Sequence, residues 1–202
     1  MNIPAIPMTA NVLSTYLNGL AAPMQKILDM EKKGEVIRLK RGLYIVANAK
    51  PNTFLIANHL YGPSYVSRES TLRYYGLIPE HVESVTSVTT LRSNAFDNTL
   101  AHFSYLHLPM DYYSLGVSIQ TEGEVSFQIA SPEKALADLL ILTSGVRLRY
   151  KKEVIEYLEH DLRLDMDAFY KMDAAVFEHL ATVSKKPQAL LNIAKIIRYD
   201  HI

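Results

Sequence analysis

The chain has 202 residues, of which 49% are hydrophobic, which is enough apolar material for one large domain or two smaller ones. It contains no cysteine, which excludes disulfides and thiolate chemistry and fits a reducing compartment. No apolar run approaches the roughly 18 residues that a membrane span requires. The first 22 residues lack the basic start and the uninterrupted apolar core of a signal peptide. We therefore expect a cytoplasmic protein.

The net charge is zero, but the charges are unevenly distributed along the chain. Residues 1–50 contain seven Lys or Arg and three acids, a net of +4, which leaves 14 basic and 18 acidic residues, a net of −4, for the rest. The acidic excess is steepest over residues 153–178, with eight acids against two basic residues. A basic head on an acidic body suggests two surfaces with two kinds of partner.

The basic head is predicted to begin with two helices. Thr9 can cap a first helix that ends near Asn18. Pro23 suits the first position of a second helix, because its missing N–H would be unpaired there in any case. Gly34 follows two lysines, as expected for a helix that ends in a left-handed cap with cations near its negative end.

The second helix is expected to have an apolar stripe and a polar face. Met24, Ile27 and Leu28 recur at helical spacing and predict the buried stripe. The residues predicted for the opposite face are Ala22, Gln25, Lys26, Asp29 and Lys33.

A basic hairpin is predicted directly after this helix. Ile37 and Leu39 alternate with Arg38 and Lys40, Arg41-Gly42 forms the turn, and Leu43 and Ile45 then alternate with Tyr44 and Val46. A short helix followed by such a hairpin predicts the C-terminal half of a winged helix-turn-helix, with the helix in the DNA major groove and the hairpin over flanking phosphates. The alternative is a surface helix and hairpin with solvated lysines. The candidate DNA-binding residues are Gln25, Lys26, Asp29, Lys33, Arg38, Lys40 and Arg41.

The expected fold class is α+β, with a winged helix-turn-helix over residues 1–50 and a mixed α/β body over residues 51–202 that is helical from about residue 131. Residues 49–51 are the predicted boundary. The predicted elements of the body are, in chain order, a helix from Asn52 or Thr53 to Leu60, a strand at 65–66, a helix capped by Ser67, strands at 85–90 and 103–108, a hairpin over 117–129, a helix from Ser131 to Thr143, and further helices at 154–158, at 169–180 and from Pro187.

The sequence offers no pattern typical of an enzyme. The seven histidines are scattered without metal-ligand spacing, and the glycines form no phosphate-binding loop, so we expect neither a metal nor another cofactor. Two groups of charged residues are interpreted as helix caps and an ion network rather than as acid–base catalysts. They are Arg68 with Glu69, and Glu133 with Lys134 and Asp138. Tyr112-Tyr113, expected in a loop, is a candidate for a protein interface.

Three stretches in this order resemble the AbiEi family of abortive-infection antitoxins. They are residues 38–44 (RLKRGLY), which resemble the wing of that family, and residues 65–77 (YVSRESTLRYYGL) and 129–140 (IASPEKALADLL), which resemble its body domain. The resemblance spans most of the chain, from about residue 8 to 200.

The resemblance implies an antitoxin from a bicistronic toxin–antitoxin operon. Its N-terminal winged helix would bind inverted repeats in its own promoter and repress it, and its C-terminal domain would counter a nucleotidyltransferase-type toxin. By resemblance, Gln25, Lys26, Lys33, Arg38, Lys40 and Arg41 fall in the DNA-contacting helix and wing. Asp29 and Glu31 depart from a phosphate-facing surface, so two copies on a repeat, as a homodimer or a cooperative pair, are expected to be required.

The alternative is a protein-interaction module whose winged helix no longer binds DNA. The acids of the second helix and the acidic segment at 153–178 favour it. An enzyme acting on nucleotides or nucleic acid would need a metal or a dense carboxylate cluster, which the sequence does not offer.

Overall fold

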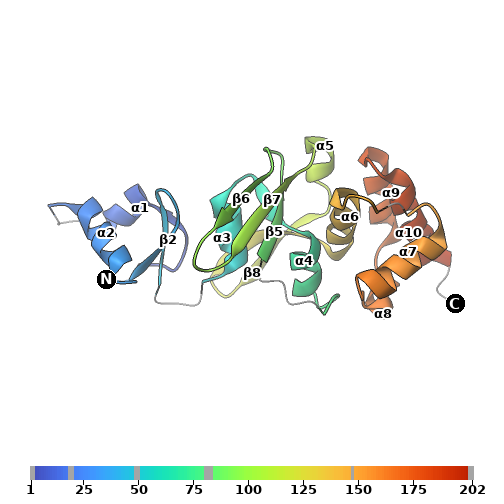
Figure 1. The fold of residues 1–202 in the computed structure, drawn as a ribbon, viewed down its shortest axis with the longest axis horizontal. Helices are drawn as coiled ribbons and strands as arrows, with labels where there is room; N and C mark the ends of the chain where they lie inside the picture. The colour runs from blue at the N-terminus through green and yellow to red at the C-terminus, as the bar shows by residue number, and fades with distance from the viewer. Residues whose placement is uncertain (1–2, 18–20, 48–50, 80–83, 147, 200–202) are drawn as a thin grey trace.

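The computed structural model describes residues 3–17, 21–47, 51–79, 84–146 and 148–199. Figure 1 shows an elongated molecule in which a small N-terminal unit, a larger sheet and a group of helices follow one another along the long axis. The predicted α+β class and the helical C-terminal part are confirmed, since the described residues beyond Ala130 form helices and loops only.

The N-terminal unit consists of two helices and a three-stranded antiparallel sheet with strand order β1-β3-β2. Its elements are β1 (Met8–Thr9), α1 (Ala10–Thr15), α2 (Pro23–Lys32), β2 (Val36–Lys40) and β3 (Leu43–Val46). The order helix, helix, hairpin is the one predicted, whereas the assignment to the winged-helix class stays a prediction.

Local signals set the ends of these elements. The Thr9 hydroxyl accepts a hydrogen bond from the Val12 amide at 3.3 Å, as an N-cap does. Pro23 is the first residue of α2. Gly34, with φ +71°, follows α2, and Gly42, with φ +78°, turns the chain between β2 and β3.

The middle of the molecule is a mixed six-stranded sheet with strand order β6-β7-β5-β4-β9-β8, in which β4–β9 and β5–β7 are the parallel pairs. Its elements are α3 (Thr53–Leu60), β4 (Ser64–Val66), α4 (Arg68–Tyr74), β5 (Ser84–Thr89), β6 (Asn94–Asp97), β7 (His102–His107), β8 (Val117–Glu122) and β9 (Val125–Ala130).

The far end of the molecule is helical. Its elements are α5 (Met110–Tyr113), α6 (Pro132–Leu142), α7 (Lys151–Glu156), a π-helix η1 (Tyr157–Asp161), α8 (Met166–Phe169), α9 (Ala174–Val183) and α10 (Pro187–Tyr199). As predicted, Ser131 caps α6 by accepting from the Lys134 amide at 3.2 Å.

Alternating side chains of the six-stranded sheet face two hydrophobic layers. Val66 and Ile129 point to the layer that holds α3, whereas their neighbours Tyr65 and Ala130 point to the layer that holds α4, α6 and the C-terminal helices. The sheet is therefore buried on both faces where β4 pairs with β9, as parallel strands usually are.

The small sheet joins the N-terminal unit to the body. One of its faces, with Val36 and Tyr44, packs on α1 and α2. Its other face, with Leu39, Leu43 and Ile45, belongs to the same hydrophobic cluster as α3. Of the predicted boundary at 49–51, residues 49 and 50 lie outside the described residues, and one hydrophobic cluster contains side chains from both sides of it.

Several predictions for the body need correction. Strand β6 and helix α5 were not predicted. Tyr112, expected in a loop as a candidate for an interface, is 1% exposed within α5, and its ring packs on the Lys134 ammonium. The helix predicted at 169–180 is two helices, α8 and α9, because Asp173 begins a new helix by accepting from the Ala175 amide.

Candidate nucleic-acid interface

Helix α2 buries a narrower stripe than the sequence predicts. Ile27 and Met30 are buried against α1 and the small sheet. Met24 and Leu28, predicted to share that stripe, are instead 51% and 38% exposed. The prediction is confirmed for Ile27 and wrong for Met24 and Leu28, because the few elements of the unit cover only one side of α2.

The exposed face of α2 therefore differs from the predicted one. Met24, Gln25, Leu28 and Lys32 follow one another at spacings that place them on one side of a helix. Of the predicted residues, Asp29 borders this face and Lys26 lies farther round the helix; both are half-exposed, and Lys33, the C-cap residue, is exposed. Sequence reasoning missed Met24, Leu28 and Lys32; the first two have the apolar character expected of core positions.

Two side-chain contacts order this face. The Gln25 amide nitrogen donates to an Asp29 carboxylate oxygen at 3.2 Å, one helical turn away. Arg38 on β2 pairs with Glu31 of α2 at 2.8 Å, and its guanidinium lies 5.7 Å from the centre of the Tyr44 ring. Tyr44 and then Glu31 raise the pKa of Arg38 above its usual value. Arg38 thus connects the hairpin to α2, and Glu31 offsets its charge.

Lys40 lies apart from the other predicted residues. Its ammonium donates to the carbonyl of Leu60, the last residue of α3, at 2.5 Å, and lies 5.7 Å from the centre of the Phe96 ring. A cation is stabilised at a helix C-terminus because the unpaired carbonyls there carry negative partial charge. The structure therefore assigns Lys40 to the junction with the body, and its prediction as a phosphate contact is corrected.

The two N-terminal helices have exposed outer residues, among them Val12, Met24, Gln25 and Lys32. In Figure 1, α1 and α2 form one end of the molecule, with β2 and its sheet between them and the body. Lys32, Lys33 and Arg41 are exposed and make no ion pair with any residue that the structure describes. A helix face with unpaired cations at the end of a molecule can approach a large anionic partner.

A second polar centre lies inside the body. Lys134 and Asp138 on α6 are both 0% exposed, and their charged atoms are 3.0 Å apart. The other Asp138 oxygen accepts from the Ser67 hydroxyl at 2.6 Å and from the Tyr65 hydroxyl at 2.9 Å. The Lys134 ammonium donates to the Tyr112 backbone carbonyl at 2.9 Å and lies 3.4 Å from the centre of the Tyr112 ring.

Burial disfavours both charges of this pair. It lowers the pKa of Lys134 and raises that of Asp138, and in each case the partner opposes the shift. Through these hydrogen bonds the buried pair connects α6 to β4 and α5, and neither side chain reaches solvent. The predicted contact between Lys134 and Asp138 is confirmed.

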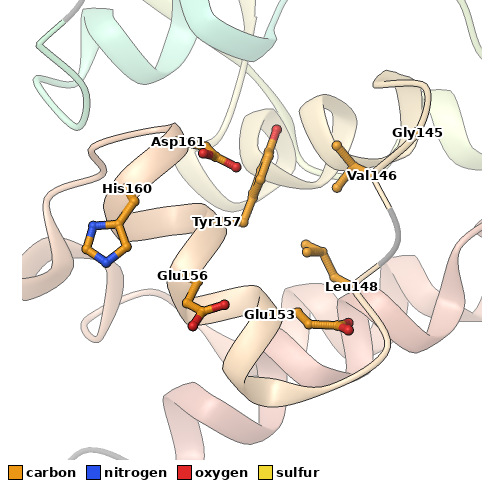
Figure 2. A pocket seen from close by; sticks show the side chains of 8 residues that line it. All are labelled: Gly145, Val146, Leu148, Glu153, Glu156, Tyr157, His160 and Asp161. Atoms are coloured by element: carbon orange, nitrogen blue, oxygen red, sulfur yellow. The ribbon is translucent and has the colours of Figure 1, made fainter.

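An open pocket of about 510 Å³ lies beside the π-helix (Figure 2). It is lined by Gly145, Val146, Leu148, Glu153, Glu156, Tyr157, His160 and Asp161. The Glu153 carboxylate accepts from the amides at residues 149 and 150, and the His160 ring points away from Tyr157 and Val146 (Figure 2). Within the described residues, no group of three or more His, Cys, Asp or Glu could hold a metal ion.

The described helices include none with the length and apolar character needed to cross a membrane.

No protein-family model matches the chain, and no curated protein sequence matches it.

Proposed function

We propose that this chain is a DNA-binding transcriptional autorepressor and an antitoxin that counters a nucleotidyltransferase-type toxin. The observation that carries the DNA-binding half is the exposed face of α2, the helix at one end of the molecule (Figure 1), with Gln25, Lys32 and Lys33 exposed. The antitoxin half is supported by the resemblance of residues 65–77 and 129–140 to the body of AbiEi antitoxins.

The proposed contact follows from the dimensions of DNA. The major groove admits one α-helix, and Gln can hydrogen-bond base edges there. Lysines and arginines beside the helix contact phosphates and release counterions, which makes binding salt-dependent. Within the described structure, four N-terminal cations have neither an ion pair nor a side-chain hydrogen bond: Lys26, Lys32, Lys33 and Arg41. If all four contact phosphates, one copy gives a slope of log K against log salt of roughly −3.6.

The test is a binding assay across salt concentrations, with the duplex directly upstream of the chain's own coding sequence. The Lys32→Ala/Lys33→Ala variant should bind more weakly than wild type, with a slope flatter by about 2. The matched control is Lys171→Ala/Lys195→Ala, which removes the same charge from exposed positions in the C-terminal helical part. Absence of binding by wild type, or equal losses in the two variants, would overturn the proposal.

The antitoxin half needs a separate test. The toxin encoded beside this chain should arrest growth when expressed alone, and co-expression of the full chain should restore growth. Continued arrest at matched expression levels would overturn this half and leave the DNA-binding half standing.

A protein-interaction module without DNA binding remains the second candidate function. It is favoured by the exposed apolar side chains of the N-terminal helices, since large exposed apolar groups often mark protein contacts. These are Val12 and Tyr16 on α1, and Met24 and Leu28 on α2. A chain that co-purifies with the neighbouring gene's product but binds no upstream duplex would favour this function.

A further inference from the structure

Two large apolar side chains stand in the middle of the proposed DNA-contacting face. Met24 and Leu28 are 51% and 38% exposed and lie one turn apart on the ten-residue helix α2. Gln25 and Lys32 share their side of the helix. The core of the N-terminal unit is filled by other residues, so packing within the described chain does not explain these two positions.

The chemistry around the two side chains restricts what can cover them. Lys32 and Lys33 follow directly along the helix, so the apolar centre is flanked by unpaired cations. An anionic partner with small apolar groups on a surface narrow enough for one helix fits this combination. The major groove meets the description, because the thymine C5-methyl is its apolar group and phosphates border it.

We propose that Met24 and Leu28 read thymine methyl groups in the operator while Lys32 and Lys33 contact the flanking phosphates. The inference rests on the proposed DNA binding and adds its sequence preference. Four residues of α-helix span about 6 Å, and successive bases of one strand are about 3.4 Å apart. A helix lying along the groove would therefore contact thymines roughly two base pairs apart in each half-site.

The test compares two duplexes that differ only in methyl groups. One is the natural upstream duplex, and in the other every thymine is replaced by deoxyuridine, which keeps the base pairing and removes the C5-methyl. Wild type should bind the uracil duplex about 4-fold more weakly for each methyl lost from a contact, or about 15-fold for two in one half-site. The Met24→Ala/Leu28→Ala variant should bind both duplexes equally.

Controls separate this inference from the function on which it rests. Val12→Ala/Tyr16→Ala removes exposed apolar groups from α1 and should keep the wild-type ratio between the two duplexes. The ratio of wild-type binding to the two duplexes tests the inference without any variant. If the double variant does not fold, the single variants Met24→Ala and Leu28→Ala replace it. Equal binding of both duplexes by wild type overturns the inference but not DNA binding, whereas binding to neither duplex overturns both. Loss of a co-purifying protein in the double variant, with an unchanged duplex ratio, would assign the face to a protein partner and also overturn it.

Discussion

Replacing Asp138 by Asn tests whether the buried pair on α6 is ionised and how much it stabilises the fold. Asn keeps the size of the side chain and can still accept from Ser67 and Tyr65, but it removes the negative charge 3.0 Å from the Lys134 ammonium. Both residues are 0% exposed, so the remaining cation has no water to replace its partner. Breaking such a pair costs about 3–5 kcal/mol, against a total stability of about 5–15 kcal/mol for a typical domain.

The assay is urea unfolding followed by circular dichroism. Asp138→Asn should lower the unfolding midpoint strongly, and Lys134→Met/Asp138→Asn should recover much of the loss, because the double variant leaves no isolated buried charge. Arg198→Met is the control, since it breaks the exposed pair with Glu178 and should leave the midpoint almost unchanged.

A near-wild-type midpoint for Asp138→Asn would refute the reasoning. It would mean that Asp138 is already protonated in the folded state, as its raised pKa permits, and that the pair is neutral. A double variant no more stable than the single one would likewise show that the charge of Lys134 is not the cause.

Three further predictions concern packing, pH and salt. Gly116→Ala should destabilise more than Gly123→Ala, by about 1–3 kcal/mol in thermal unfolding, because both have positive φ but only a Cβ at 116 meets another side chain, at 2.8 Å. Burial raises the pKa of the Tyr105 hydroxyl above its usual value of 10. The hydroxyl therefore contributes fully to the free energy of unfolding below pH 10, and this contribution is lost as the pH rises further. Above pH 10, the stability advantage of wild type over Tyr105→Phe in urea unfolding should shrink by about 1.4 kcal/mol per pH unit. Lys40→Met should lower the unfolding midpoint without changing the salt slope of DNA binding. Arg41→Ala should flatten that slope by about 1 and leave the unfolding midpoint unchanged. A flatter slope with an unchanged midpoint for Lys40→Met would contradict the placement of Lys40 at the junction.

The sequence by itself determined where several elements of this protein begin and end. Thr9, Pro23 and Ser131 start helices, and Gly34 and Gly42 end a helix and turn a hairpin, as predicted. These signals work because a cap or a turn depends on backbone groups within about four residues, so the local sequence contains the whole interaction. The charge division between the first fifty residues and the rest could also be counted directly.

Only the tertiary structure decided which side of each element faces solvent. Met24 and Ile27 are both apolar and were predicted to share one buried stripe, but only Ile27 packs against α1 and the small sheet, whereas Met24 is exposed. Lys40 differs from Arg41 because the end of α3, twenty residues away, supplies its acceptor. Burial and ion pairing depend on contacts between distant segments, and such contacts determined which cations of the candidate interface have no partner among the residues that the structure describes.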